Sequence, residues 1–227
     1  EAPPIAIIGM GRLGGRETSF GSDADVVFVH GGETDAERRA ASRIAESVKA
    51  LLAAPTADPP LVIDLDLRPE GKGGVLVPSL AAYRRYYADR AKLWERQALL
   101  RARAVAGDEA LLAEWTELAD AVRYRPGGLT EAERIEFRRV KARVDSERLP
   151  RGADPNGHTK LGRGGQVVIE WAAPLLQLEH GEDPRMRTTR TVPALEAAAA
   201  GGHLDRASLE DLRSAWEFVS RVRNDMT

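Results

Sequence analysis

The first third of the chain alternates between the period-two pattern of strands and the spacing of amphipathic helices. Residues 5–8 form a short apolar run that ends at a glycine, typical of a buried strand or of a helix end feeding a turn. Residues 26–29 are β-branched and aromatic, which predicts a strand. Thr34 and Glu37 form a capping-box pattern ahead of apolar positions at helical spacing, so we expect a helix that ends before Pro55.

The next strand is predicted over residues 61–67, where apolar and polar positions alternate. Its apolar side chains would face one way, and Asp64 and Asp66 would face the other. Residues 69–74 are rich in glycine and predict a turn, after which residues 75–77 are expected to return as a hairpin strand.

After residue 77 the pattern becomes helical. One long helix is expected to carry the aromatic stripe of Tyr83, Tyr87 and Trp94. Further helices are expected around residues 111–118, 130–144, 193–200 and 208–222, the last capped by Ser208 with Asp211, and an apolar segment runs over residues 167–178. The chain is therefore predicted to be α+β, with a mixed part followed by an all-α part and a break between about residues 100 and 125.

Composition excludes several classes of protein. The net charge of −2 over 227 residues does not favour nucleic-acid binding. The absence of cysteine excludes disulfides and thiolate metal sites, and it fits a reducing, cytoplasmic location. No apolar run approaches about 18 residues, so no membrane span is expected. The abrupt apolar start, without a signal peptide, and the end inside a helical pattern indicate a fragment of a longer protein.

Gly9, Gly11 and Gly14 follow the first apolar run and match the dinucleotide-binding fingerprint. That fingerprint requires a following helix and then a strand ending in an acidic residue about 20 residues on. Residues 16–21 are too few and too rich in turn formers for that helix, and the acidic residues come at the start of the next strand. We therefore favour a turn that brings main-chain N–H groups to phosphates, although a tight turn alone would explain one or two of the glycines.

Asp23 and Asp25 flank Ala24 at the start of the second strand, so both carboxylates are expected on one face. Two carboxylates this close repel each other unless a dication bridges them. A solvated strand start is the alternative, and the pattern in isolation does not decide between the two. Beside a glycine-rich turn, the acidic pair predicts a metal-dependent site for nucleotidyl transfer.

A two-metal phosphoryl-transfer site needs a further carboxylate on a neighbouring strand, which Asp64 or Asp66 offers. Spacing does not choose between them, and a solvated strand face is again the alternative. Arg68 and Lys72 follow directly and could neutralise phosphate charge.

Several segments, in order along nearly the whole chain, resemble the glutamine synthetase adenylyltransferase family. They are GMGRLGGRE at 9–17, GSDAD at 21–25, DLDLRPEG at 64–71, WERQALLRAR at 94–103, SERLP at 146–150, and KLGRGG at 160–165 ahead of IEW at 169–171. The resemblance implies a nucleotidyltransferase fold of the DNA polymerase beta-like type, a mixed sheet with helices, over residues 1–105. It implies an all-α helical bundle over residues 106–227.

Full-length enzymes of this family carry two nucleotidyltransferase halves of opposed activity. The N-terminal half removes AMP from glutamine synthetase by phosphorolysis, and the C-terminal half attaches AMP from ATP to a tyrosine of the synthetase. Residues 146–156 resemble C-terminal halves of actinobacterial type, so the resemblance implies the adenylylating reaction, with release of pyrophosphate, in the regulation of nitrogen assimilation. The alternatives are the deadenylylating half, nucleotidyl transfer to a small molecule, and a non-catalytic nucleotide-binding regulatory module.

The resemblance also assigns site residues. The family's catalytic and metal-binding carboxylates match Asp23, Asp25 and Asp64, which would hold two Mg²⁺ ions, with Asp64 as the base. Asp66 falls at a more variable position, and Val168 stands where the family commonly has an acidic residue. ATP contacts are expected from Gly11, Arg12, Gly14, Gly15, Ser22 and Arg68. Lys160 and Arg163 lie in a second basic, glycine-rich loop, which predicts a phosphate or partner contact, with an ordinary interhelical loop of solvated cations as the alternative.

The resemblance implies protein partners as well. Glutamine synthetase is the expected substrate, and a PII-type signal protein is a further candidate partner of the full-length enzyme. No nucleic acid and no membrane is expected as a partner.

Overall fold

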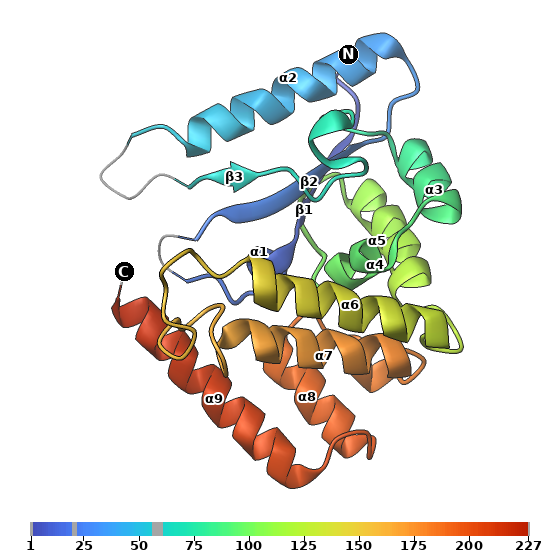
Figure 1. Cartoon of the computed structure of the whole chain (residues 1–227). Coiled ribbons are helices and arrows are strands. Elements are labelled where there is room, and N and C mark those ends of the chain that lie inside the picture. Colours follow the sequence, from blue (N-terminus) through green and yellow to red (C-terminus); the bar gives the residue numbers. More distant parts are fainter. Residues whose placement is uncertain (1, 20–21, 56–60, 227) are drawn as a thin grey trace. The chain divides into compact units, whose positions relative to one another are not determined.

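The computed structural model describes residues 2–19, 22–55 and 61–226. The chain divides into two compact units, Glu1–Val122 and Arg123–Thr227 (Figure 1). The first unit combines strands and helices, and the second is helical in the part that is described. The predicted α+β class is thereby confirmed.

The first unit is built on a mixed sheet, whose described strands lie in the order β3–β2–β1–β4. β1 pairs antiparallel with both β2 and β4, and β3 pairs parallel with β2. Their bounds are β1 Ile5–Gly9, β2 Ala24–His30, β3 Ile63–Asp64 and β4 Arg103–Gly107. β2 is buried along almost its whole length, which explains its continuous apolar run.

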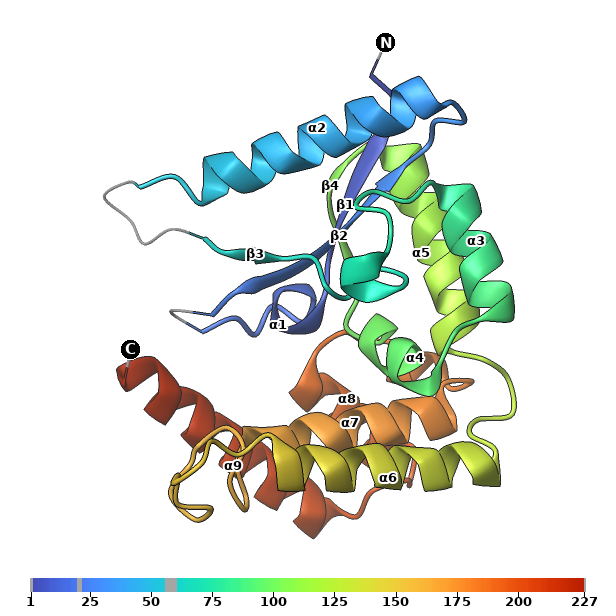
Figure 2. The ribbon, with the colours of Figure 1, turned by 45° about the horizontal axis from the view of Figure 1, so that its top comes forward.

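Helices cover both faces of the sheet (Figure 2). Ala24, Val26 and Phe28 pack on the side of α2, whereas Val27 and Val29 pack on the side of α3, α4 and α5. Alternation along β2 therefore places the side chain of residue 25 on the face that α3, α4 and α5 cover. The helices of this unit are α1 Gly11–Gly14, α2 Asp35–Leu52, the 3-10 turn η1 Gly71–Gly73, α3 Leu80–Asp89, α4 Leu93–Leu99 and α5 Glu109–Arg123.

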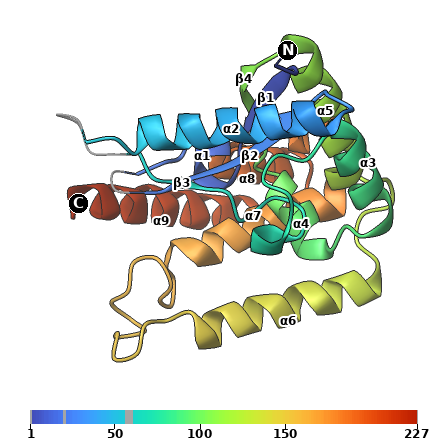
Figure 3. The same ribbon diagram turned by 90° about the horizontal axis from the view of Figure 1, so that it is seen from above.

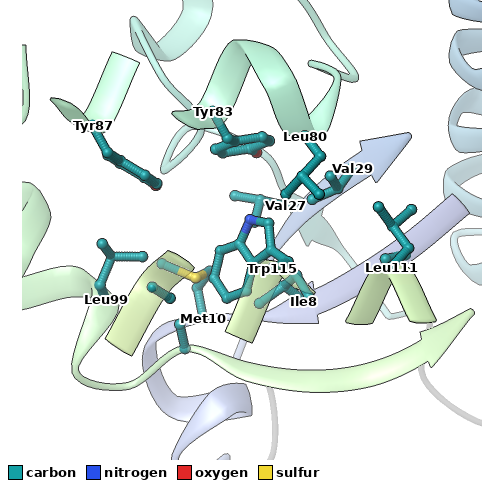
Figure 4. Close-up of a cluster of buried hydrophobic side chains, with 13 residues drawn as sticks. Ile8, Met10, Val27, Val29, Leu80, Tyr83, Tyr87, Leu99, Leu111 and Trp115 are labelled. Carbon is teal, nitrogen blue, oxygen red and sulfur yellow. The ribbon is translucent and has the colours of Figure 1, made fainter. Parts of the chain in front are cut away.

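Tyr83 of α3 and Trp115 of α5 lie at the centre of the core between these helices and the sheet (Figure 4). Their rings meet edge to face, with centroids 6.3 Å apart and planes at 85°. The Tyr83 hydroxyl donates to the carbonyl oxygen of Phe28 at 3.3 Å. Burial raises the pKa of Tyr83 well above its usual value, so this hydroxyl stays a donor. The core thus fixes β2, the strand that carries Asp25.

The second unit consists of α6 Glu131–Glu147, α7 Gln166–His180, the 3-10 turn η2 Pro184–Met186, α8 Thr191–Ala200 and α9 Arg206–Asp225. Ile169, Leu195 and Trp216 join α7, α8 and α9 in one apolar cluster. A long loop from residue 148 to residue 165 links α6 to α7 (Figure 3). No helix in the described part of the chain is both long and apolar enough to cross a membrane.

Most predicted elements are confirmed. The strands at 5–8 and 26–29 are β1 and β2, and the capping box of Thr34 with Glu37 begins α2. The helices expected at 111–118, 130–144, 193–200 and 208–222 are found as α5, α6, α8 and α9, and the apolar segment at 167–178 forms α7.

The strand predicted over 61–67 is wrong in length. β3 ends at Asp64 because the Asp64 carboxylate accepts the backbone N–H of Asp66 at 2.7 Å, which closes a turn. Asp64 and Asp66 therefore do not share a strand face. Residues 75–77 are not a hairpin strand either, since they lie in irregular backbone between η1 and α3.

Two helix boundaries also differ from the prediction. The long helix through Tyr83 and Trp94 is two helices, because the Glu95 carboxylate accepts the N–H of Lys92 at 2.9 Å and starts α4 anew. The last helix is capped by Asp205 instead of Ser208.

One strand was not predicted. β4 is a mostly exposed edge strand, so its residues lack the apolar pattern of a core strand. The DNA polymerase beta-like type stays a prediction, as does the domain boundary between residues 105 and 106. Along the chain, the first compact unit ends at Val122.

Candidate functional site

Two acidic side chains come together where β2 begins and β3 ends. Parallel pairing sets Asp25 directly beside Asp64, one position after the pair Ala24 and Ile63. Because side chains alternate between faces, the two carboxylates project to one side, while Ala24 and Ile63 are buried on the other. The register of the sheet therefore brings Asp64, and not Asp66, next to Asp25.

Asp66 has different neighbours although it lies only two residues beyond Asp64. Its carboxylate lies 3.3 Å from the ammonium of Lys72 and 4.0 Å from the guanidinium of Arg68. Arg68 is largely buried and donates to the carbonyl oxygens of Leu65 at 2.7 Å and Lys72 at 3.2 Å. Arg68 therefore braces the loop after β3, and its contact with ATP stays a prediction.

Asp23 lies just before β2 and is exposed. Within residues 2–19, 22–55 and 61–226, no three acidic, histidine or cysteine side chains gather as ligands of one ion. The pair of Asp25 and Asp64 nevertheless fits magnesium, because this ion takes one or two carboxylates and completes its shell with phosphate oxygens and water. These two carboxylates would hold Mg²⁺ together with the phosphates of a nucleotide, whereas the structure does not bring Asp23 together with both of them, and its part as a metal ligand stays a prediction.

The glycine-rich turn begins against the Asp25 carboxylate. Gly11 has a φ of +48°, and a Cβ placed there would lie 2.1 Å from Asp25 Oδ2. The backbone N–H of Met10 donates to the carbonyl oxygen of Asp25 at 2.8 Å, which fixes the turn to the strand. Gly11 is thus required both for its left-handed backbone and for the space that the carboxylate occupies.

Gly14 and Gly15 close this turn. A Cβ at Gly14 would lie 1.7 Å from the carbonyl oxygen of Arg101, so packing alone requires glycine there. The N–H of Gly14 donates to the carbonyl oxygen of Met10 at 2.8 Å, and the N–H of Gly15 donates to the carbonyl oxygen of Gly11 at 3.1 Å. Because each amide has one hydrogen, both N–H groups are already used within the turn. The predicted contacts of Gly14 and Gly15 with the triphosphate would therefore come from close approach of the backbone and not from these N–H groups.

Three charged residues hold the turn; they lie in the family-like segments 9–17 and 94–103, but the sequence assigned no role to any of them. Arg101 donates through Nε to the carbonyl oxygen of Gly11 at 2.9 Å and pairs with the carboxylate of Glu17. Arg103 donates to two carbonyl oxygens of α1, at 3.0 and 3.1 Å. Burial, and then the charge of Arg16, lower the pKa of Arg103 from its usual value. The partners in these contacts are 84 to 90 residues apart along the chain. No local spacing pattern in the sequence could therefore predict the contacts.

Arg12 lies within the turn, and Ser22 directly precedes Asp23. Arg12 is half-buried in α1, and its carbonyl oxygen accepts the N–H of Glu17 at 2.9 Å. The hydroxyl of Ser22 lies 2.7 Å from that of Ser19. Residues 20 and 21 lie outside the described residues, and residue 21 is the first of the family-like segment 21–25. Contacts of Arg12 and Ser22 with ATP stay predictions.

Lys160 and Arg163 belong to the second unit, in the loop before α7, and both are exposed. His158 Nδ1 accepts the N–H groups of Lys160 at 3.3 Å and Leu161 at 3.1 Å, so this loop is a compact, hydrogen-bonded turn. Val168 is exposed on α7. The ATP contacts of Lys160 and Arg163 stay predictions.

Comparison with known proteins gives a consistent result. The model of the glutamate-ammonia ligase adenylyltransferase family matches residues 1–118. Relatives named bifunctional glutamine synthetase adenylyltransferase/adenylyl-removing enzyme are 52% identical in Streptomyces avermitilis and in Mycolicibacterium smegmatis, over 97% of this chain. A relative of the same name in Cutibacterium acnes is 48% identical over 99% of the chain. The chain spans only 22–23% of the length of these relatives.

Proposed function

This chain belongs to the glutamate-ammonia ligase adenylyltransferase family, and we propose that it transfers AMP from ATP to a tyrosine hydroxyl of glutamine synthetase, with release of pyrophosphate. The observation that carries this proposal is the side-by-side placement of Asp25 and Asp64 on neighbouring strands, with Gly11 against the Asp25 carboxylate. Carboxylates in this arrangement beside a glycine-rich turn suit a nucleotide triphosphate with its metal.

Each residue has a distinct role in this proposal. Asp25 and Asp64, with Asp23, would hold two Mg²⁺ ions, which when bound would neutralise charge on the transferring phosphoryl group and the leaving pyrophosphate. The turn from Gly11 to Gly15 would approach the triphosphate closely, because glycine offers no side chain to exclude it. Arg68, which belongs to the same unit as the carboxylates, would contribute positive charge.

Asp64 is the proposed base for the tyrosine hydroxyl. An unperturbed tyrosine has a pKa of about 10, so a neighbouring carboxylate that accepts its proton favours attack at neutral pH. Asp64 Oδ1 already accepts the N–H of Asp66, which orients the carboxylate. Its other oxygen, Oδ2, would then face the incoming hydroxyl.

The direction of the reaction is the finer part of the proposal. The similar proteins are named as bifunctional, with both adenylyltransferase and adenylyl-removing activity. The likeness of residues 146–156 to C-terminal halves favours adenylylation. The deadenylylating reaction would use the same carboxylates with phosphate in place of ATP.

Two parallel reactions test the proposal. The 227-residue chain is incubated with unmodified glutamine synthetase, ATP and Mg²⁺, and separately with adenylylated synthetase, inorganic phosphate and Mg²⁺. A gain of AMP on the synthetase in the first reaction, without loss in the second, supports the adenylylating half. Loss of AMP only in the second assigns the opposite half, and ATP binding without either reaction makes the chain a regulatory module.

A further inference from the structure

The ion pair between Arg101 and Glu17 joins two segments that are distant in the sequence. Arg101 lies in the turn between α4 and β4, and Glu17 lies just after α1. Their side chains are only 14% and 10% exposed, so both charges have lost most of their contact with water. The cost of removing two charges from water largely cancels their attraction, which makes such a pair a poor source of net stability. What a buried pair supplies is a defined distance between the segments that it joins.

The α1 turn depends on contacts from outside. One helical turn of four residues is too short to be stable alone. Arg16, which follows it, has a φ of +56°, a left-handed conformation that is unfavourable for a residue with a side chain. This conformation reverses the chain, so that the Glu17 N–H bonds back to Arg12 at 2.9 Å and its carboxylate meets Arg101. The ion pair therefore secures a strained turn.

Gly11 contacts both this ion pair and the Asp25 carboxylate. Arg101 Nε donates to its carbonyl oxygen at 2.9 Å, while the Asp25 carboxylate occupies the space where a Cβ at this position would lie. A single residue therefore separates the guanidinium of Arg101 from the carboxylate of Asp25. A shift of Arg101 would move Gly11, and the spacing between the glycine-rich turn and Asp25 would change with it.

We propose that Arg101 and Glu17 are positioning residues that hold the glycine-rich turn at a fixed spacing from Asp25, and so set the affinity for the nucleotide. This inference rests on the proposed function, because it assumes that ATP binds between the turn and Asp25. It assigns neither residue a contact with the substrate.

The test compares Arg101→Lys and Glu17→Gln with a matched control. Arg101→Lys keeps the charge but loses the planar group that serves Gly11 and Glu17 together. Arg134→Lys in α6 is the control, since Arg134 forms a similar two-contact pair with Glu179, at 2.6 and 2.8 Å, in the second unit. Binding of ATP with Mg²⁺ is measured by calorimetry, and amide hydrogen exchange is followed in peptides covering residues 9–17.

We expect Arg101→Lys and Glu17→Gln to weaken ATP binding by at least about tenfold and to speed exchange at residues 9–17, with the control at wild-type values. In the transfer reaction, KM for ATP should rise while KM for glutamine synthetase stays unchanged. If the unaltered chain binds ATP and Arg101→Lys binds it equally well, the inference is wrong and the proposed function stands. If the unaltered chain binds no ATP, the proposed function fails and the inference fails with it.

Discussion

Asp64 and Asp66 are only two positions apart, but their carboxylates have different neighbours. The Asp64 carboxylate stands beside Asp25 in the sheet, whereas the Asp66 carboxylate lies 3.3 Å from the Lys72 ammonium. Spacing left the choice between them open, because a strand through residue 67 would place both on one face, and only the resemblance to the family favoured Asp64. The turn that Asp64 itself caps removes Asp66 from that face.

We predict that Asp64→Asn lowers the rate of AMP transfer by at least about a thousandfold, since it removes both the proposed base and a metal ligand. Asp66→Asn is the matched control and should lower the rate less than about threefold. Initial rates with ATP, Mg²⁺ and glutamine synthetase are the measurement. Equal losses in the two variants would contradict the assignment of the third carboxylate.

Gly14 offers a second prediction at the scale of single residues. A Cβ there would lie 1.7 Å from the carbonyl oxygen of Arg101, so Gly14→Ala must displace backbone. We expect a loss of about 1–3 kcal/mol in the free energy of unfolding, measured with urea. Gly73→Ala is the control, because no atom lies within 4 Å of a Cβ at that position. Equal stability of the two variants would show that the turn adjusts freely.

Among the elements, those with a strong apolar period could be predicted and those fixed by local polar contacts could not. α2 was predicted from its capping box, and α5 was predicted from its stripe of Leu111 and Trp115. The break between α3 and α4 depends on one hydrogen bond from Lys92 to Glu95, which interrupts an aromatic stripe that looks continuous in the sequence. β4 is an exposed edge strand, so nothing in its pattern separates it from a loop.

The start of α6 gives a prediction on pH. Burial raises the pKa of Glu133, but hydrogen bonds from Thr130 and Arg125 outweigh it and hold the pKa at about 2, against a usual 4.5. Ionised Glu133 therefore stabilises the fold above pH 4.5, and this contribution is lost as the pH falls from 4.5 toward 2.

Glu133→Gln should therefore cost about 1 kcal/mol at pH 7 and clearly less at pH 3, as followed by thermal unfolding at both pH values. Glu131→Gln serves as the control, since Glu131 lies on the same helix and is 70% exposed. Glu131→Gln should change the stability of the fold only slightly at either pH. A cost of Glu133→Gln that does not change with pH would contradict the role of the ionised carboxylate.

At the scale of the whole molecule, the order of the motifs along the sequence predicted a site for nucleotidyl transfer. The register of the sheet then brings two of the proposed site residues side by side. Asp25 and Asp64 are separated by 39 positions along the chain, yet β2 and β3 pair them directly. The partners Arg101 and Gly11 are 90 residues apart, a contact that only the folded chain makes. Lys160 and Arg163 belong to the second unit, whereas the carboxylates belong to the first. The contacts of these two residues with ATP therefore stay predictions from the sequence.

The most direct test of the central claim is mass spectrometry of glutamine synthetase after incubation with the 227-residue chain, ATP and Mg²⁺. The wild-type chain is predicted to add one AMP to a tyrosine of each synthetase subunit. Asp25→Asn, which keeps the size of the side chain against Gly11, is predicted to add none while its thermal unfolding stays within a few degrees of wild type. AMP transfer by Asp25→Asn at a rate near that of the wild-type chain would contradict the account.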